Sequence, residues 1–402
     1  MSSRPQYTLM LAAAVLFSVA GCKQSTAPKP TPAAQAAATA PAEIGGAKVV
    51  ELKSTATPTG DKPEFLSATI LPGRGMNVFE ITAYVPGKGV VKVLASPSLA
   101  EAADKLNGGP GDEYGNASFS FGGAFLVPYP NRILGTLSKD RKTLTAKWHG
   151  KTVTLPANWP GKNPTDRPVA MHGLILNVKA QDVKVAPIPG GQQLTATIHA
   201  GDFGGHWFSD TDLNFTLSLT GSEFDAQIKA ANVGKNPEPI AIGWHPYFAI
   251  PSGQHAQARL HVPATQMAKV NNYDEDFPTG KIVPVKGTRF DFNAPNGEPL
   301  DGHYLDDNWS NLKRTNGAVD VRFSDPADNY GVQISGIAPE IKTVQVYSPP
   351  TAKFAAVEEQ FNFSDPFGKE WHGMNTGMVT LKPGSSVLWH VHLSLFTPPF
   401  KK

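Results

Sequence analysis

The side chains best suited to acid–base chemistry in this chain lie in short motifs that combine proline, aromatic and polar residues. Asn131 and Arg132 follow two prolines in residues 128–133 (PYPNRI), so a stiff backbone can hold the guanidinium in a fixed place. His245 lies in residues 244–248 (WHPYF), where the following proline favours an extended histidine and three aromatic residues surround it. Aromatic faces of this kind pack well against the C–H groups of a sugar ring.

Three further motifs add ionisable groups. They are residues 171–173 (MHG) after a long proline-rich loop, residues 306–309 (DDNW), and residues 357–360 (VEEQ). Each motif taken singly is more often structural, because loop arginines form surface ion pairs, histidines among aromatics belong to the core, adjacent glutamates face solvent and Asp-Asp-Asn forms turns. Only the whole set of motifs favours a catalytic site.

The elements that must position these motifs are strands. Apolar and polar residues alternate over residues 144–155, 194–199, 213–219, 224–229, 342–347 and 387–396. The chain has 38 glycines and 36 prolines among 402 residues, a content that favours many short strands joined by turns over a helical bundle. The sequence therefore predicts an all-β, antiparallel sandwich. One short helix is expected after Ser98, which forms a capping box with Glu101, and it should end at residues 107–109 (NGG).

Charge and cysteine content exclude several classes of protein. The chain has 36 Lys and Arg against 34 Asp and Glu, a formal net charge of +2, so it has no basic stripe and we expect no nucleic acid partner. A single cysteine excludes a disulfide framework and cysteine-based zinc clusters. The 11 histidines make a metal-dependent hydrolase a rival class, but only His390 and His392 have a chelating arrangement, on one strand face. We therefore expect neither a metal nor another cofactor.

The N-terminus resembles a bacterial lipoprotein signal. Arg4 precedes an apolar run over residues 9–19, which is too short to span a bilayer as a mature helix and suits the core of an export signal. Small residues then precede Cys22, the only cysteine. We predict a signal peptide over residues 1–21 and lipidation of Cys22, with an ordinary signal peptide and an incidental cysteine as the alternative.

Residues 22–48 are rich in alanine, proline and threonine and predict a flexible tether, since they can bury little apolar surface. The folded domain is then expected over residues 49–402. Because Lys23 rather than aspartate follows the lipidated position, we expect a protein of the bacterial cell envelope, lipid-anchored at the periplasmic face of the outer membrane.

The motifs, taken in this order, resemble those of the aldose 1-epimerase (galactose mutarotase) family. Residues 232–239 (NVGKNPEP) leading into residues 243–248 (GWHPYF) are similar to the central signature of that family. Residues 377–384 (GMVTLKPG), which precede a final strand, are similar to its C-terminal part. The resemblance extends from about residue 50 to about residue 400.

This resemblance implies a galactose-mutarotase-like antiparallel β-supersandwich that acts on a free monosaccharide (aldose) without a cofactor, and we expect a monomer. It implies that Glu358 is the catalytic base and His245 the catalytic acid. A bell-shaped pH–rate profile is expected, with the Glu358 limb at lower pH than the His245 limb. The sugar-binding residues implied are Asn131, Arg132, His172, Asp306 (with Asp307 as the alternative) and Gln345.

The residue types suit the reaction. Exchange of α and β anomers needs a base at the anomeric hydroxyl and an acid at the ring oxygen. Histidine suits the role of the acid because its ordinary pKa lies near neutral pH. Some motifs differ from the usual family pattern: residues 127–130 (VPYP) replace Gly-Arg, residues 171–174 (MHGL) replace Leu-His-Gly-Gly, and Glu359 stands where threonine or proline is common. The sequence therefore does not identify the sugar. A non-catalytic carbohydrate-binding lipoprotein on the same scaffold is the alternative function.

Overall fold

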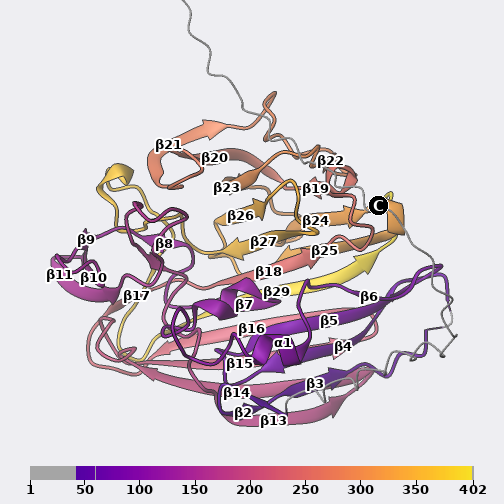
Figure 1. Cartoon of the computed structure of the whole chain (residues 1–402), viewed down its shortest axis with the longest axis horizontal. Helices are drawn as coiled ribbons and strands as arrows, with labels where there is room; N and C mark the ends of the chain where they lie inside the picture. Colours follow the sequence, from indigo (N-terminus) through magenta and orange to yellow (C-terminus); the bar gives the residue numbers. More distant parts are fainter. Residues whose placement is uncertain (1–41, 59, 401–402) are drawn as a thin grey trace, which may run out of the picture. The chain divides into compact units, whose positions relative to one another are not determined.

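The alternating segments form the strands of two large antiparallel sheets in a computed structural model that describes residues 42–58 and 60–400 (Figure 1). The larger sheet has 11 strands. In spatial order they are β21 (Pro278–Pro284), β20 (Ala264–Val270), β23 (Leu305–Leu312), β26 (Thr343–Ser348), β27 (Phe354–Gln360), β18 (Gly243–Ala249), β7 (Gly123–Leu126), β5 (Asn77–Val85), β4 (Glu64–Leu71) and β3 (Val50–Lys53), with β6 (Gly89–Lys92) paired to β5.

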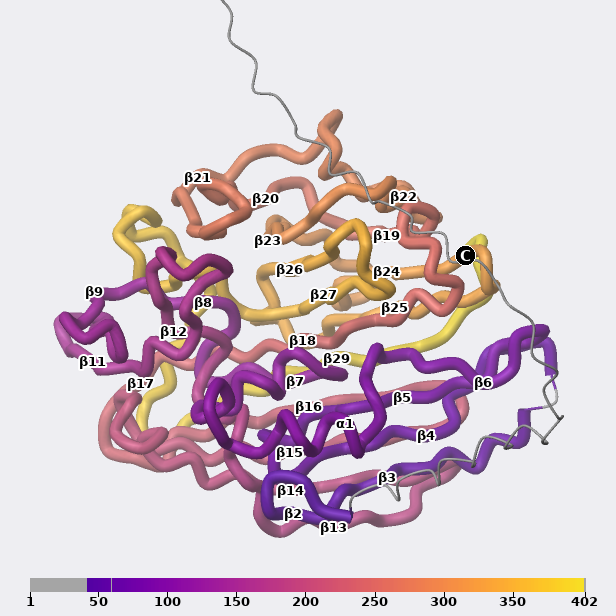
Figure 2. Tube along the Cα trace, in the orientation of Figure 1, coloured from indigo at the N-terminus to yellow at the C-terminus, as the bar shows by residue number. Residues whose placement is uncertain are grey.

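The second sheet has nine strands, and its C-terminal strand lies in the middle (Figure 2). The order is β13 (Gln181–Ile188), β14 (Gly191–Gly201), β15 (Thr211–Thr220), β16 (Glu223–Asn232), β29 (Ser386–Phe396), β25 (Tyr330–Gly336), β24 (Val319–Asp325), β19 (Arg259–His261) and β22 (Glu298–Pro299). Strand β29 pairs along one edge with β16 and along the other with β25, so the end of the chain joins the two halves of this sheet.

Aromatic side chains from both sheets meet in the core between them. Phe125 of β7 stacks on Trp244 of β18 with ring centroids 6.0 Å apart. From the facing sheet, Trp389 of β29 and Phe215 of β15 lie 5.8 Å and 5.6 Å from Phe125. All four rings are buried. Their burial accounts for the alternation of the sequence, because each strand turns one side toward this core, and it confirms the predicted all-β sandwich.

Smaller elements lie outside the two large sheets. The short β-pairs are β1 (Glu43–Ile44) with β2 (Ala47–Lys48), β8 (Arg132–Ile133) with β12 (Ala170–Met171), β17 (Glu238–Ile240) with β28 (Val379–Leu381), and β9 (Thr136–Leu137) with the hairpin β10 (Thr143–Trp148) and β11 (Lys151–Pro156). The one α-helix in the described residues is α1 (Leu99–Ala103), and the 3₁₀ turns are η1 (Asn116–Ser120), η2 (His255–Gln257), η3 (Pro326–Asp328) and η4 (Lys369–Trp371).

Local sequence signals are confirmed where a side chain satisfies the backbone. Ser98 accepts a hydrogen bond from the Glu101 backbone while the Glu101 carboxylate accepts one from the Ser98 backbone, so α1 begins at the predicted capping box. The helix ends at Ala103, before the predicted stop at residues 107–109. The predicted hairpin over residues 144–155 is also present, as β10 and β11.

The N-terminal boundary of the folded body differs from the expected one. Residues 43–48, which we placed in the tether, form the β1–β2 hairpin, and Ile44 is buried in a cluster with Leu71 and Phe79. The burial of the Ile44 side chain explains why this part of the predicted tether is ordered. The predicted signal peptide, Cys22 and the rest of the tether lie outside the described residues. Within the described chain no helix is both long and apolar enough to cross a bilayer.

Candidate active site

The predicted acid–base pair comes from strand pairing in the middle of the larger sheet. Gln345 of β26 is the cross-strand partner of Glu358 of β27. On the other side of β27, Tyr247 of β18 pairs with Ala356, and this register continued by two residues brings His245 opposite Glu358. His245 Nε2 then lies 3.4 Å from Glu358 Oε1. Residues more than 100 positions apart therefore meet because neighbouring strands hold them in one row.

Successive side chains of a strand point to opposite sides of the sheet, so only one residue of each acidic pair, Asp306–Asp307 and Glu358–Glu359, can face the cavity. Asp306 of β23 lines the same cavity as Glu358. Asp307 does not line it and instead accepts a hydrogen bond of 2.8 Å from the Tyr273 hydroxyl. Glu359 is buried on the opposite side of β27 and is absent from the cavity lining. The geometry therefore assigns the carboxylates of the site to Asp306 and Glu358.

A pair of short strands brings the remaining predicted residues to the cavity. Strands β8 and β12 are antiparallel, and the His172 backbone N–H donates to the Asn131 carbonyl over 2.7 Å. Asn131 and His172 both have positive φ, at 61° and 60°. Gly173 follows with φ of 79°, and a Cβ there would lie 2.3 Å from the Val127 carbonyl oxygen. The close approach of two backbones thus explains the His-Gly motif.

All seven predicted site residues line one cavity of about 460 Å³, a size usual for small-molecule sites. The residues that sequence reasoning did not assign are mostly aromatic. The full lining comprises Phe119, Ser120, Asn131, Arg132, Trp159, Lys162, Met171, His172, His245, Tyr247, Tyr304, Asp306, Gln345, Tyr347 and Glu358. The cavity therefore combines ring-sized apolar faces with hydrogen-bonding groups, a combination that suits a sugar.

Hydrogen bonds fix the polar wall of the cavity. The Asn131 side-chain amide donates to Gln345 Oε1 over 3.2 Å, and Gln345 Nε2 donates to Asp306 Oδ1 over 3.0 Å. Lys162 Nζ lies 3.4 Å from Asp306 Oδ2 and 3.0 Å from the Tyr304 hydroxyl. The amide groups and the carboxylate are therefore held in fixed orientations before any ligand arrives.

Arg132 owes its position to a residue that the sequence motifs did not reveal. Its guanidinium donates to both the backbone carbonyl and the carboxylate of Asp276, which is buried in the loop between β20 and β21. Burial alone would lower the pKa of Arg132, but the carboxylates of Asp276 and Asp306 raise it. Arg132 is consequently a fixed cation on the cavity wall.

Several buried polar atoms around this cavity have no hydrogen-bond partner within residues 42–58 and 60–400. They are Asn131 Oδ1, His172 Nδ1, His245 Nδ1 and Glu358 Oε2. Buried polar atoms are nearly always hydrogen-bonded in folded proteins, because an unsatisfied one costs about 1–3 kcal/mol. Four such atoms on one small cavity indicate that it is built to receive the hydroxyl groups of a ligand.

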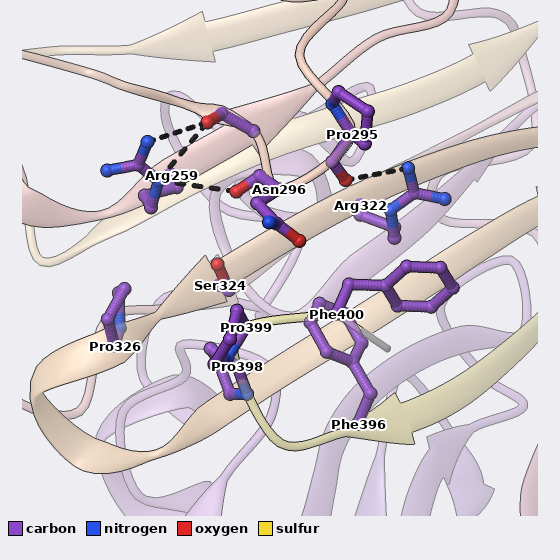
Figure 3. A pocket seen from close by; sticks show the side chains of 11 residues that line it. Arg259, Pro295, Asn296, Arg322, Ser324, Pro326, Phe396, Pro398, Pro399 and Phe400 are labelled. Atoms are coloured by element: carbon purple, nitrogen blue, oxygen red, sulfur yellow. Dashed lines mark hydrogen bonds between the residues drawn. The ribbon is translucent and has the colours of Figure 1, made fainter. Parts of the chain in front are cut away.

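A second cavity, of about 280 Å³, lies between strands β19 and β24 and the C-terminal residues (Figure 3). Its two arginines already donate to backbone carbonyls, Arg259 to Asn296 and Gly297 and Arg322 to Pro295. No carboxylate or imidazole is among the residues that line it. This cavity lacks a general acid–base pair, so the cavity with His245 and Glu358 is the candidate active site.

A comparison with protein-family models matches residues 93–394 to the model described as aldose 1-epimerase. The chain belongs to the aldose 1-epimerase family. Among solved structures it is similar to a galactose mutarotase-like protein from Clostridium acetobutylicum, with 20% identity and a TM-score of 0.67 over 86% of this chain and 98% of that chain. It is also similar to a GalM/aldose epimerase homologue from C. elegans, with 18% identity and a TM-score of 0.63 over 86% and 98%. A galactose 1-epimerase from Lactobacillus acidophilus gives 15% identity and a TM-score of 0.59 over 87% and 99%.

At these identities the structural matches establish the fold, which is the galactose-mutarotase-like fold expected from the sequence. A search of curated proteins gives no match. Inference about the chemistry of this member of the epimerase family therefore rests on the site itself.

The acid–base pair of this epimerase-family protein is buried, and burial acts on its two members in opposite directions. Burial lowers the pKa of His245 to about 4. Burial, together with the Asp306 carboxylate, raises the pKa of Glu358 well above its usual value, while Arg132 acts in the opposite sense. Both shifts favour the form of the pair in which Glu358 holds the proton and His245 is neutral. These shifts place the pKa of Glu358 above that of His245, the reverse of the order expected from their ordinary pKa values, because both groups are buried.

Two classes of site residue carried no clear signal in the sequence. Lys162 and Asp276 lie in polar loops, where no periodicity shows which side chain turns inward. Tyr247, Tyr304 and Tyr347 each lie two positions from a site residue, on a strand or directly before one; this spacing is a weak signal that becomes readable only once the motifs are placed on strands.

His390 and His392, the only candidate chelating pair in the sequence, lie on β29 outside this cavity, and both contact the Asp225 carboxylate. Across residues 42–58 and 60–400, no group of three or more His, Cys, Asp or Glu side chains is placed to hold a metal ion.

Proposed function

We propose that the protein interconverts the α and β anomers of a free aldose by opening and reclosing the sugar ring. The observation that carries this proposal is the buried pair of His245 Nε2 and Glu358 Oε1, 3.4 Å apart, in a cavity of one-sugar size. An acid and a base so close can act on the ring oxygen and the anomeric hydroxyl of the same sugar, since these two oxygens share one carbon atom.

In the forward step, the Glu358 carboxylate takes the proton of the anomeric hydroxyl and imidazolium His245 protonates the ring oxygen. The bond between C1 and the ring oxygen breaks as the C1 carbonyl forms. Rotation about the C1–C2 bond then presents the other face of the aldehyde. On reclosure the new ring hydroxyl attacks C1 and returns its proton to His245, while Glu358 protonates the carbonyl oxygen.

This cycle conserves the single proton of the pair. The proton must reside on His245 for ring opening to begin, a form that the pKa shifts of the resting pair disfavour, and it is on Glu358 in the open-chain state. Arg132 near the carboxylate lowers the pKa of Glu358, which favours the form that starts the cycle. The steps need no group other than the two side chains and the sugar.

Other residues of the cavity orient the sugar. Arg132 and Asp306 are placed to form charge-assisted hydrogen bonds with ring hydroxyls. Burial lowers the pKa of His172 well below its usual value, so a neutral imidazole with an unpartnered Nδ1 faces the substrate. Such a group suits a hydroxyl, which can donate and accept hydrogen bonds.

Mutarotation of freshly dissolved α-glucose and α-galactose, followed by polarimetry, tests the proposal. Acceleration that saturates with sugar concentration supports an epimerase. Binding of sugar without acceleration would instead support the non-catalytic carbohydrate-binding protein, the alternative function.

We propose further that the protein acts as a lipid-anchored monomer in the bacterial cell envelope, at the periplasmic face of the outer membrane. The support is the signal-like sequence that ends at Cys22, with Lys23 after it. Radiolabelled palmitate should be incorporated into the wild-type protein and not into Cys22→Ser. Recovery of label in the variant, or of the protein in the inner-membrane fraction, would contradict the anchor or its placement.

A further inference from the structure

A second hollow adjoins the catalytic cavity, and we call it the outer groove. It has a volume of about 650 Å³ and shares Phe119, Ser120 and Trp159 with the catalytic cavity. Its other lining residues are Lys105, Gly111, Glu113, Tyr114, Asn116, Ala117, Phe121, Ala157, Asn158 and Pro160. The outer groove is therefore formed by the segment from α1 to η1 and by the loop after β11.

The wall between the two hollows consists of aromatic rings that lie against His172 and close to His245. Phe119 lies edge-on to His172 with ring centroids 4.8 Å apart, and 6.3 Å from the His245 ring. Its other neighbour is Trp159, 5.8 Å away. A ligand that passes over these rings can therefore occupy the catalytic cavity and the outer groove at once.

The outer groove has the two kinds of surface that a sugar ring needs. Tyr114 is 47% exposed and Trp159 is partly exposed, so aromatic faces are available for stacking on C–H groups. The Phe121 ring already has Lys105 Nζ over it, 5.4 Å from its centroid. The Ser120 and Tyr114 hydroxyls and the Trp159 indole N–H line this groove and form no hydrogen bond with another described residue. These donors and acceptors can serve the hydroxyl groups of a ligand instead.

The order of the two hollows gives the ligand a direction. The anomeric carbon must lie at His245 and Glu358 for the proposed reaction, so only the reducing end of a chain can enter the catalytic cavity. The outer groove is the larger of the two hollows and has space for a further ring. The reducing unit then lies in the catalytic cavity and the next unit against Tyr114 and Trp159.

We propose that the outer groove binds the second monosaccharide unit of a reducing oligosaccharide while the protein epimerises its reducing end. This inference rests on the proposed epimerase function. It goes beyond that function in assigning a second subsite to the outer groove, which would make reducing disaccharides and longer chains preferred over free monosaccharides.

The test compares glucose with maltose, cellobiose and lactose, which all have glucose at the reducing end. For the wild-type protein, kcat/KM for at least one disaccharide should equal or exceed that for glucose. Tyr114→Ala should lower this disaccharide value by roughly fivefold, the factor expected for one lost aromatic contact, and leave the glucose value unchanged. Tyr84→Ala, which removes a partly buried tyrosine outside both hollows, should change neither value.

The proposal is overturned if glucose is the best substrate of the four, or if Tyr114→Ala changes all four values equally or not at all. If no sugar is turned over, the proposed epimerase function is wrong. Calorimetric binding of the same four sugars then tests separately whether the outer groove binds a second monosaccharide unit. Tighter binding of a disaccharide than of glucose, lost in Tyr114→Ala, would support the groove. Equal affinities in the wild-type protein would overturn it.

Discussion

Replacing Glu358 by glutamine removes the proposed base with the least change in shape. The side chain is 1% exposed, and Gln nearly preserves its volume, so the fold should survive. What the variant loses is the ability to take a proton at the atom that lies 3.4 Å from His245 Nε2. We expect kcat to fall by at least about 10²-fold, which corresponds to about 2.7 kcal/mol of transition-state stabilisation.

The assay is polarimetric mutarotation at saturating sugar, with unfolding followed by circular dichroism in parallel. KM should change far less than kcat, because Arg132, Asp306 and Gln345 still bind the sugar. Glu359→Gln is the matched control. Its carboxyl group is buried on the other side of β27, and both of its oxygens lack a hydrogen-bond partner, so the substitution should leave kcat within about twofold of wild type.

Two results would contradict the role of Glu358 as the base. Wild-type activity in Glu358→Gln on every sugar tested would remove the acid–base role of this residue. A large loss in Glu359→Gln instead would show that the register of β27 places the other glutamate in the cavity.

Four further perturbations test the same account. His245→Asn should lower kcat by a similar factor, and the double variant with Glu358→Gln should be no slower than the slower single variant, because the two groups act as a unit; additive losses would contradict the shared-proton pair. The pH–rate profile should be bell-shaped. Activity should be lost as the pH falls through about 4, the lowered pKa of His245, where the pair gains a second proton, and lost again as the pH rises through the raised pKa of Glu358. An acid limb near pH 6.5, the ordinary pKa of histidine, would contradict the effect of burial. Arg132→Ala should lower kcat/KM by at least about tenfold, while an unchanged value would place Arg132 outside the substrate contacts. Cys22→Ala should release the protein from the membrane fraction without loss of activity, whereas membrane retention would disprove the anchor.

The strands could be predicted from the sequence because a sheet with one buried side requires apolar and polar residues to alternate along each strand. The segments over 213–219 and 224–229 fall within the observed hairpin of β15 and β16 for this reason. The capping box of α1 was equally visible, since it depends on two side chains three positions apart.

The alternation of residues alone does not choose between adjacent carboxylates; the family resemblance implied Glu358, and Asp306 with Asp307 as the alternative. Asp306 and Asp307, or Glu358 and Glu359, differ only in the side of the strand to which they belong, and a shift of one residue in register exchanges them. The register is set by partners distant in the chain, such as Gln345 opposite Glu358.

The loops around the site were the least predictable part. Lys162 reaches Asp306 across 144 positions, and Asp276 meets Arg132 across the same separation, so their positions depend on the completed fold. The reversal of the two pKa values has the same origin, because burial is a property of the assembled cavity and not of the motifs.

The most direct test of the central claim is the rate of α–β exchange of glucose and of a reducing disaccharide, measured at equilibrium by NMR exchange spectroscopy with the wild-type protein and with Glu358→Gln. We predict exchange that is faster than in buffer, saturable and dependent on Glu358. Exchange at the buffer rate in the presence of demonstrably bound sugar would contradict the epimerase function and leave a carbohydrate-binding protein on this fold.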